Sequence, residues 1–250
     1  MAKLIVLHSF RRGVGRSTIA ANVGALLARA GQRVCVVDAN IRSPSLHVLF
    51  GIPETTLTNT LNTYLWGQCA LPQAVAAVMP DDRELGGRLF LLPATCEPHE
   101  LARILNKRAS LEALNAGLVE LIEHFALDVL LLDGDAGLSP ETLAFMTIAD
   151  IVLLLMHCDQ QDYQGTGILV DVARKIDVPR LLILVNEVPT AFDLTAIRRQ
   201  ISAAYRCEVA VAVPHSAEMM TLDSQGLFVL RYPAHPLTAL YRELVDKLMV

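Results

Sequence analysis

The stretch KLIVLHSFRRGVGRSTIAANVGALLARAG, Lys3–Gly31, contains the pattern that decides the fold. Its apolar start over residues 3–9 predicts a buried strand, and the amphipathic run from Ser17 to Gly31 predicts a helix. Between them lies the turn FRRGVGRST, which has two glycines and three arginines. A glycine-bearing turn between a strand and a helix is typical of loops that bind phosphate, because the helix contributes free amides and the positive end of its dipole.

The same alternation of strand-like and helix-like segments continues along the chain. Six further apolar runs predict strands at 33–38, 89–93, 128–133, 150–156, 181–186 and 208–213. Amphipathic segments predict helices at 97–108, 110–125, 140–147, 160–175, 193–204, 216–225 and 236–249. Such alternation predicts an α/β fold, with a doubly wound, mostly parallel sheet flanked by helices. No polar linker divides the sequence, so we expect residues 1–250 to form a single domain.

Composition narrows the class of protein. The net charge of -5 argues against an overall electrostatic grip on nucleic acid, although a local basic patch stays possible. The apolar runs are far shorter than the roughly 18 residues of a membrane span, and we expect no signal peptide. The five cysteines are scattered, without a C-x-x-C pair. This pattern favours reduced thiols and a cytoplasmic protein.

Polar residues recur where the expected strands end. In an open α/β sheet the ligand lies beyond the carboxyl ends of the strands, so these positions are where a site is expected. The positions are 10–17, 38–42, 133–137, 157–160, Asn186 and Pro214.

The turn itself offers the parts of a phosphate-binding loop. Such a loop needs glycines for a tight turn, a cation for the phosphates and a hydroxyl for Mg2+. Gly13 and Gly15 supply glycines, Arg16 the cation and Ser17 the hydroxyl. The first glycine and the lysine of G-x-x-x-x-G-K-[ST] are both missing. A basic turn without a ligand is therefore the alternative reading of this segment.

Taken together, FRRGVGRST, VVDANIRSPSLHVLFG, VLLLDGDAGLS and LLILVNEVP resemble the MinD/ParA group of deviant Walker A P-loop ATPases. The resemblance covers nearly the whole chain. The middle section is most similar to the TadZ/CpaE pilus-localisation branch and to FlhG-like regulators. A likeness to capsule-type tyrosine kinases is weaker, because Tyr232 and Tyr241 do not form the terminal tyrosine cluster of those kinases.

The resemblance implies a nucleotide site for ATP and Mg2+. Ser17, Asp38 and Asp133 would be the metal-site residues, Arg16 would stand at the phosphate-binding lysine, and Arg11 at the signature lysine that crosses a dimer interface. Asn186 would recognise adenine, with the backbone near Pro214 closing the pocket. The nucleotide-binding residues implied are Arg12, Gly13, Val14, Gly15, Arg16, Ser17, Thr18, Asn186 and Pro214.

The resemblance also implies partners. Family members form a homodimer through the nucleotide face and position cell machinery on membranes or the nucleoid. We therefore expect a homodimer and a regulatory or cargo protein, and nonspecific DNA binding stays open. The last helix, 236–249, has a broad apolar stripe and few cations, which predicts docking on the core and not direct membrane anchoring.

Departures from the family motif bear on catalysis, for which the residues implied are Arg11, Arg16, Asp38 and Asn40. Phe10 and Arg12 replace glycines, so the turn must avoid positive φ at Phe10 or accept strain. Asn40 replaces an aspartate that helps to deprotonate the attacking water, and an amide cannot act as a base. Two hypotheses follow: a slow ATPase switch in which Arg11 or Arg12 reaches across the dimer, and an inactive dimeric scaffold.

One further acidic residue has two possible roles. Asp135 follows Asp133 by two positions, at the end of the strand expected at 128–133. It can contact the switch region, or it can cap the helix that begins near residue 140. We expect the cap, because aspartate is a strongly preferred residue at the start of a helix.

Overall fold

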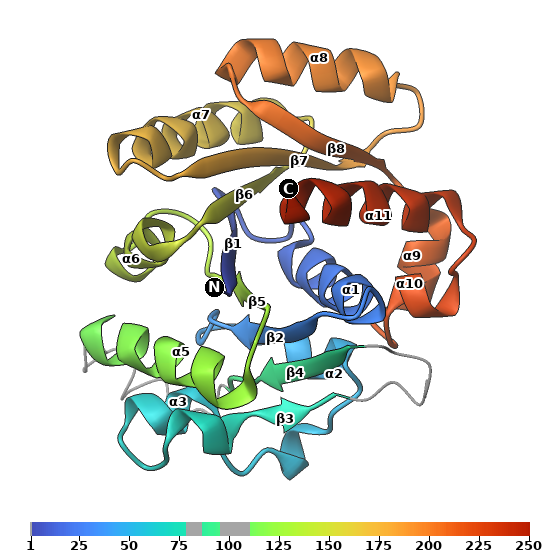
Figure 1. The fold of residues 1–250 in the computed structure, drawn as a ribbon. Coiled ribbons are helices and arrows are strands. Elements are labelled where there is room, and N and C mark those ends of the chain that lie inside the picture. Colours follow the sequence, from blue (N-terminus) through green and yellow to red (C-terminus); the bar gives the residue numbers. More distant parts are fainter. Residues whose placement is uncertain (1, 79–86, 96–110) are drawn as a thin grey trace.

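The fold is built on one eight-stranded sheet (Figure 1). The computed structural model describes residues 2–78, 87–95 and 111–250. Within these residues the strand order is β3-β4-β2-β5-β1-β6-β7-β8, and every neighbouring pair is parallel except β3 and β4. The strands are β1 Lys3–Ser9, β2 Arg33–Asp38, β3 Ala76–Ala77, β4 Arg88–Leu92, β5 Val129–Asp133, β6 Ile151–Met156, β7 Arg180–Val188 and β8 Glu208–Pro214. All seven predicted strands are confirmed, and β3 was too short to be predicted.

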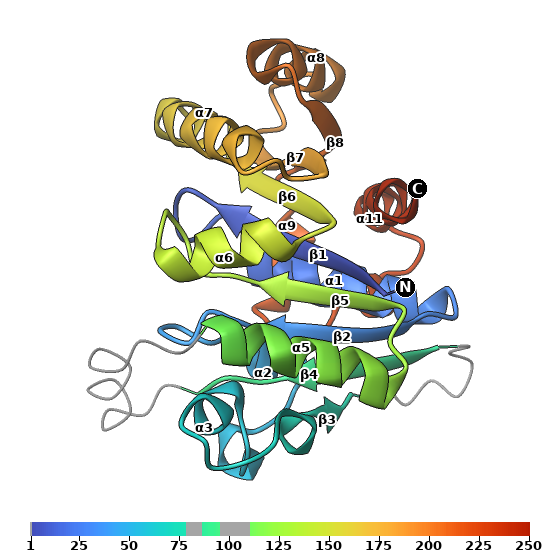
Figure 2. The ribbon, with the colours of Figure 1, turned by 60° about the vertical axis from the view of Figure 1, so that its left-hand side comes forward.

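Helices cover both faces of the sheet, as the doubly wound prediction requires (Figure 2). The α-helices are α1 Arg16–Arg29, α2 Leu46–Leu49, α3 Leu61–Leu65, α5 Leu111–Phe125, α6 Pro140–Ile148, α7 Gln160–Lys175, α8 Leu194–Tyr205, α9 Ala217–Leu222, α10 Phe228–Arg231 and α11 Pro236–Met249. Two short 3-10 helices are η1 Glu54–Thr56 and η2 Leu71–Ala74. The helix predicted at 97–108 lies outside the described residues.

The core is divided into two layers by the sheet. Side chains alternate along each strand, so in β1 Ile5 and Leu7 point to one face while Leu4 and Val6 point to the other. The first face packs against α1, α10 and α11, and the second against α5, α6, α7 and α8. Because both faces are buried, the strands are apolar throughout, which is why the sequence revealed them.

Local capping explains several helix boundaries. Ser139 caps α6 by accepting a bond from the Thr142 amide at 3.2 Å, and Asp159 caps α7 through the Asp162 amide at 2.9 Å. Asp135 therefore does not cap α6, and that prediction was wrong. Helix α9 ends at Leu222, three residues earlier than predicted, because Asp223 adopts a left-handed conformation with φ 48°.

The C-terminal helix docks on the core as predicted. Its residues Leu237, Tyr241, Leu244 and Leu248 are buried, whereas Met249 is exposed. Near its end, the carbonyl of Leu248 accepts a 3.0 Å hydrogen bond from Lys3 Nζ at the start of β1. None of the helices in the described ranges combines the length and the apolar character that a membrane crossing requires.

Candidate nucleotide-binding site

The turn between β1 and α1 has the backbone of a phosphate-binding loop. Gly13 and Gly15 have φ of 81° and 84°, in the left-handed region that favours glycine. Gly15 directly precedes α1, so the free amides of the first helical turn lie beside the loop. Residues Arg12 to Thr18 line a cavity of about 450 Å³ that is also bordered by Asn40 and Ser45. This cavity can receive a chain of phosphates.

Phe10 fits where the family has a glycine because helix α7 makes room for it. Phe10 is absent from the positive-φ residues of the described chain, so the turn avoids the strain considered above. Its ring packs against Gly165 of α7. A Cβ added at Gly165 would lie 2.1 Å from Phe10 Cδ1, closer than atoms can approach. Gly165 therefore provides the notch that accepts the aromatic side chain.

The notch makes a prediction about stability. Glycine inside a helix costs about 1 kcal/mol relative to alanine, so Gly→Ala normally stabilises a helix. We expect Gly165→Ala to destabilise the fold by about 1–3 kcal/mol, because the new methyl group overpacks against Phe10. Gly167→Ala in the same helix is the control, since its Cβ meets only Tyr205 Cε1 at 3.6 Å. Urea unfolding measures both. A stabilised Gly165→Ala variant would contradict the notch.

Arg16, which was expected to stand at the phosphate-binding lysine, is turned towards the interior. Its side chain is only 7% exposed, Nε lies 3.6 Å from Asp133 Oδ1, and a terminal nitrogen donates to Ser9 Oγ. Burial lowers the pKa of Arg16, an effect that the charge of Asp133 opposes. The guanidinium thus neutralises Asp133 from beneath the loop. A phosphate that binds Arg16 must compete with both partners.

Two buried carboxylates, which we call the acidic pair, lie at the carboxyl ends of neighbouring strands. Asp38 of β2 and Asp133 of β5 are register partners and are completely buried. Asp133 Oδ2 accepts a 2.5 Å bond from Ser17 Oγ, and Asp38 Oδ2 accepts bonds from the Ser45 and Leu46 amides at 2.9 and 3.0 Å. The Oδ1 atom of each carboxylate is buried without a hydrogen-bond donor among the described residues.

The acidic pair and Ser17 fit Mg2+. This ion takes oxygen ligands. Asp38 Oδ1 accepts no hydrogen bond from the described residues, Asp133 Oδ1 has only the ion pair with Arg16, and the Ser17 hydroxyl lies beside Asp133. Burial, with the charge of Asp133, raises the pKa of Asp38. Burial also raises the pKa of Asp133, against the opposing hydrogen bond from Ser17. A bound cation would offset both penalties, because it favours the ionised carboxylates. The three residues implied for the metal site are therefore close together.

The acidic pair also predicts a pH dependence of stability. A carboxyl group whose pKa is raised by folding binds its proton more tightly in the folded state. Its contribution is therefore most favourable below the ordinary value of about 3.9 and is lost as pH rises through the raised pKa. We expect Asp38→Asn to raise the free energy of unfolding by about 1–3 kcal/mol at pH 8, because it removes a buried charge.

Urea unfolding at pH 5 and pH 8, without divalent cations, measures this effect. The gain from Asp38→Asn should shrink towards pH 5, where the folded wild type holds its proton. The exposed Asp246→Asn is the control and should leave the pH profile unchanged. Equal stability of wild type and Asp38→Asn at pH 8 would contradict a raised pKa.

Asn40 lies on the wall of the loop cavity. Its side chain is buried, Nδ2 donates to the Ser43 carbonyl at 2.9 Å, and Oδ1 has no partner among the described residues. Oδ1 can accept a hydrogen bond from water, but an amide cannot take up its proton. The structure therefore places Asn40 where it can orient a water without activating it.

Asn186 and Pro214, expected at the adenine, border a small cavity of about 60 Å³ beside Gly15 and Thr18. Asn186 Nδ2 donates to the Val14 carbonyl at 2.9 Å and so braces the loop. A Cβ at Gly15 would lie 2.4 Å from this nitrogen, which shows how closely the two meet. A base that bonds this amide competes with Val14.

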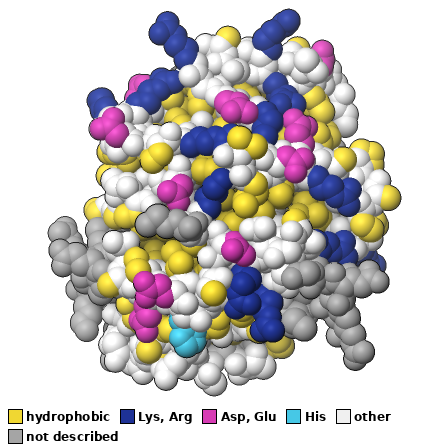
Figure 3. Space-filling model, in the orientation of Figure 1, with side chains coloured by type: hydrophobic (Ala, Val, Ile, Leu, Met, Phe, Trp, Pro, Cys, Tyr) yellow, Lys and Arg dark blue, Asp and Glu magenta, His cyan; other side chains and the backbone are white. Residues whose placement is uncertain are grey.

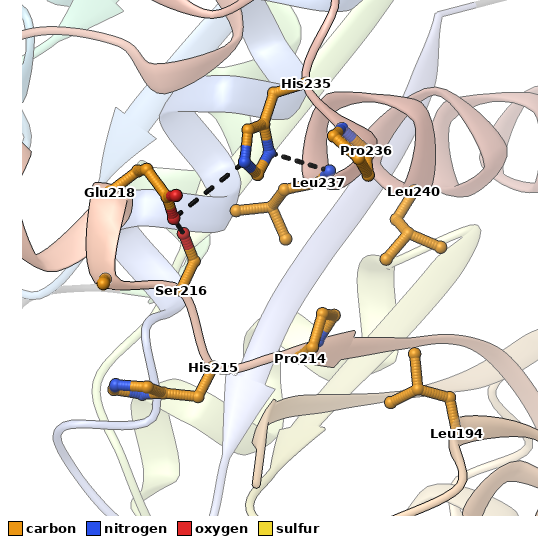
Figure 4. A pocket seen from close by; sticks show the side chains of 10 residues that line it. Leu194, Pro214, His215, Ser216, Glu218, His235, Pro236, Leu237 and Leu240 are labelled. Carbon is orange, nitrogen blue, oxygen red and sulfur yellow. Dashed lines mark hydrogen bonds and ion pairs between the residues drawn. The ribbon is translucent and has the colours of Figure 1, made fainter. Parts of the chain in front are cut away.

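Beyond Pro214 the surface opens into a second hollow of about 340 Å³ (Figure 4). Leu194, Leu237 and Leu240 give it a largely apolar lining, which sequence reasoning did not predict. The polar side chains on its other wall serve the local fold. Ser216 caps α9, and His235 Nδ1 accepts a 3.0 Å bond from the Leu237 amide at the start of α11. The hollow therefore presents a concave apolar surface to a ligand and few polar groups that a ligand could bond.

The loop arginines Arg11 and Arg12 have different surroundings. Arg11 donates from Nε to Asp162 Oδ1 at 2.6 Å and also bonds Gln161 and Asp159, all at the start of α7 of its own chain. The bond to Asp162 raises the pKa of Arg11. Arg12 is 58% exposed and lies 3.2 Å from Asp135. Arg11, the residue implied for crossing a dimer interface, is thus bonded to helix α7 of its own chain.

Sequence reasoning missed three residues that shape the site. Ser45 donates to Ser17 Oγ at 3.0 Å and lends its amide to Asp38, while Asp162 and Gly165 receive Arg11 and Phe10. Ser45 carried a weak signal, because it follows a strand end in a polar loop. The other two lie inside a helix, so only the folded chain brings them to the loop.

The turn with its two left-handed glycines before α1, and the acidic pair at the neighbouring strand ends, are the arrangement of a P-loop fold. The family described as an AAA domain matches residues 2–180. The structure has the fold of the MinD cell division protein of Aquifex aeolicus, with a TM-score of 0.78 at 21% identity over 99% of this chain and 97% of that one. The cell division ATPase MinD of Pyrococcus furiosus has a TM-score of 0.80 at 18% identity, over 100% of this chain and 99% of that one.

Relatives in sequence point the same way. An uncharacterized ATP-binding protein of Methanocaldococcus jannaschii is 24% identical over all of this chain and 88% of its own length. The septum site-determining protein MinD of Thermotoga maritima is 32% identical over 55% of this chain, and the alignment covers 46% of that protein, so about half of its length. The chain belongs to the MinD/ParA family of P-loop ATPases.

Proposed function

We propose that this chain is an ATP-binding, dimerising switch of a single domain that positions or regulates another cellular machine and hydrolyses ATP slowly. The observation that carries the proposal is the loop cavity of about 450 Å³, lined by Arg12 to Thr18, beside a buried acidic pair in which one oxygen of each carboxylate accepts no hydrogen bond from the described residues. Relatives named for septum and flagellum site determination support the positioning role.

Different residues bind the phosphates and the metal ion. The loop amides and Arg16 bind the phosphates, while Ser17, Asp38 and Asp133 hold Mg2+. Bound Mg2+ neutralises charge on the phosphate oxygens. Related folds carry such ligands: the MinD of Pyrococcus horikoshii was solved with Mg-ADP, and it has a TM-score of 0.79 at 18% identity.

The base and the dimer complete the proposal. Asn186 and the backbone near Pro214 receive the adenine once Asn186 leaves Val14. Dimerisation through the nucleotide face brings two loops together, so that an arginine of one subunit reaches the nucleotide of the other. A cargo or regulatory protein binds the dimer, as the MinC:MinD complex of Aquifex aeolicus illustrates for a protein of the same fold.

Slow hydrolysis follows from Asn40. Replacing Asn40 by Asp restores a carboxylate on the cavity wall, which can accept the proton of an attacking water. We expect Asn40→Asp to raise ATP turnover about 100-fold with little change in the dissociation constant for ATP. Phosphate release assays and calorimetry measure the two quantities. Asn59→Asp adds the same charge outside the cavity and is the control. Unchanged turnover in Asn40→Asp would show that a missing base is not the limit.

The alternative is an inactive scaffold that keeps the fold and the dimer without turnover. One observation favours it: polar groups of the loop are already bonded to other residues of the same chain. Arg16 is paired with Asp133 and Ser9, and Asn186 is bonded to Val14, so a nucleotide must displace contacts in both places. If ATP cannot displace these contacts, the nucleotide switch is excluded. If ATP binds, its turnover separates a slow switch from an inactive scaffold.

Calorimetric titration with ATP and Mg2+ tests the choice. We expect binding, and we expect Gly15→Ala to weaken it at least about tenfold, because the methyl group strains the turn and displaces Asn186 from the Val14 carbonyl that it braces. Gly31→Ala is the matched control, since Gly31 also has positive φ, at 91°, but lies outside the cavity. No heat of binding at millimolar ATP would contradict the nucleotide switch and leave the scaffold.

Nonspecific DNA binding and a cytoplasmic location remain parts of the proposal. On the face shown in Figure 3, basic side chains alternate with acidic ones among the described residues. The basic pair Arg198 and Arg199 lies on α8, where Arg198 contacts Glu243 at 3.1 Å. Any DNA contact through this pair would therefore be local and sensitive to salt.

A further inference from the structure

The loop cavity and the small cavity beside Asn186, which we call the base cavity, adjoin each other. Their linings, of about 450 Å³ and 60 Å³, have three residues in common, Gly15, Thr18 and Glu187. In a nucleotide the sugar joins the base to the phosphates. A nucleotide whose phosphates occupy the loop cavity and whose base lies at the base cavity therefore has its sugar beside these three residues.

The end of β7 presents Glu187 at this junction through an irregularity in the strand. The register of β7 against β8 shifts between Val185 and Val188, so that two residues of β7, Asn186 and Glu187, oppose a single residue of β8. A bulge of this kind redirects a side chain. Glu187 also has a φ of 51°, in the left-handed region that residues with a long side chain rarely adopt. Such costly conformations are concentrated at ligand sites.

The carboxylate of Glu187 is open to a hydrogen-bond donor. Its side chain is 47% exposed, and His157 Nε2 lies 3.9 Å from Oε2, which is beyond hydrogen-bond distance. Within the described ranges no hydrogen bond ends on this carboxylate. A carboxylate accepts hydrogen bonds and donates none. The ligand group that fits it must therefore carry donors, which the phosphates lack and the two hydroxyls of ribose supply.

The amino group of adenine is also a donor, but its place in the nucleotide does not match that of Glu187. This amino group lies at the end of the base that is remote from the sugar and the phosphates. Glu187 borders the phosphate cavity as well as the base cavity. Its position therefore favours contact with the sugar.

We propose that Glu187 binds the 2′ and 3′ hydroxyls of the nucleotide ribose and makes this chain selective for ribonucleotides. The inference rests on the proposed nucleotide site and adds recognition of the sugar. Two neighbouring hydroxyls suit a carboxylate, because each of its oxygens can accept one of their protons. Hydrogen bonds to a charged acceptor are also about twice as strong as those between neutral groups. A nucleotide without these hydroxyls loses both bonds.

The test compares the binding of ATP and 2′,3′-dideoxy-ATP, each with Mg2+, by calorimetry on the full chain. We expect the wild type to bind ATP about tenfold more tightly, because the dideoxy nucleotide lacks both donors. Glu187→Ala should weaken ATP binding about tenfold and change binding of the dideoxy nucleotide less than about twofold. Glu120→Ala, on the exposed surface of α5, is the matched control and should keep the wild-type preference.

A second variant, Glu187→Gly, separates recognition of the sugar from a defect in folding. Glycine adopts positive φ readily, so this variant removes the carboxylate without straining the backbone. It should lose the preference for ATP as Glu187→Ala does. An equal loss of affinity for ATP and for the dideoxy nucleotide in both variants would show that Glu187 serves the fold or the base, and would overturn the proposal.

The outcomes also separate this proposal from that of the nucleotide site. If the wild type binds neither nucleotide, the nucleotide site itself fails, and recognition of the sugar fails with it. If the wild type binds both equally, or if Glu187→Ala keeps the preference for ATP, the nucleotide site stands and the role of Glu187 fails. Loss of the preference in both Glu187 variants, with the Glu120 variant unchanged, supports the proposal.

Discussion

The buried acidic pair is the constraint on which the rest of the site depends. Parallel pairing of β2 with β5 fixes Asp38 beside Asp133, and the protein must compensate two carboxylates in its interior. The compensating groups come from two segments: Arg16 and Ser17 from the start of α1, and the Ser45 and Leu46 amides from the start of α2. Local stability and ligand chemistry are therefore settled by the same few contacts.

The departures from the family motif are absorbed by particular neighbours. Phe10 is accepted because α7 has a glycine opposite its ring, and Arg11 because the same helix begins with two carboxylates. These contacts tie the first half of the loop to α7, while Asn186 braces the second half through Val14. Side-chain contacts thus hold both halves of the loop in shape.

Much of this architecture could be predicted from sequence, and the reasons are physical. Strands buried on both faces are apolar throughout, and functional polar residues follow the ends of such strands. The seven main strands and the positions of Asp38, Asp133 and Ser17 could therefore be predicted. Contacts that depend on the rotamer of a side chain could not be predicted. Nothing in the spacing shows that Arg16 turns inward, that Asp135 pairs with arginines, or that Gly165 faces Phe10. The strand β3 has only two residues and carries no periodic signal.

The bond between Lys3 and the end of α11 has a practical consequence for labelling. Helix α11 begins near Pro214, beside the proposed base site, and runs back across the sheet to Leu248 next to the start of β1. Lys3 and Leu248 therefore meet at the amino edge of the sheet, opposite the loop. Fluorescent reporters attached close to these two residues would lie near each other and remote from the nucleotide face, and a short peptide bridge between the two segments is compatible with circular permutation of the fold.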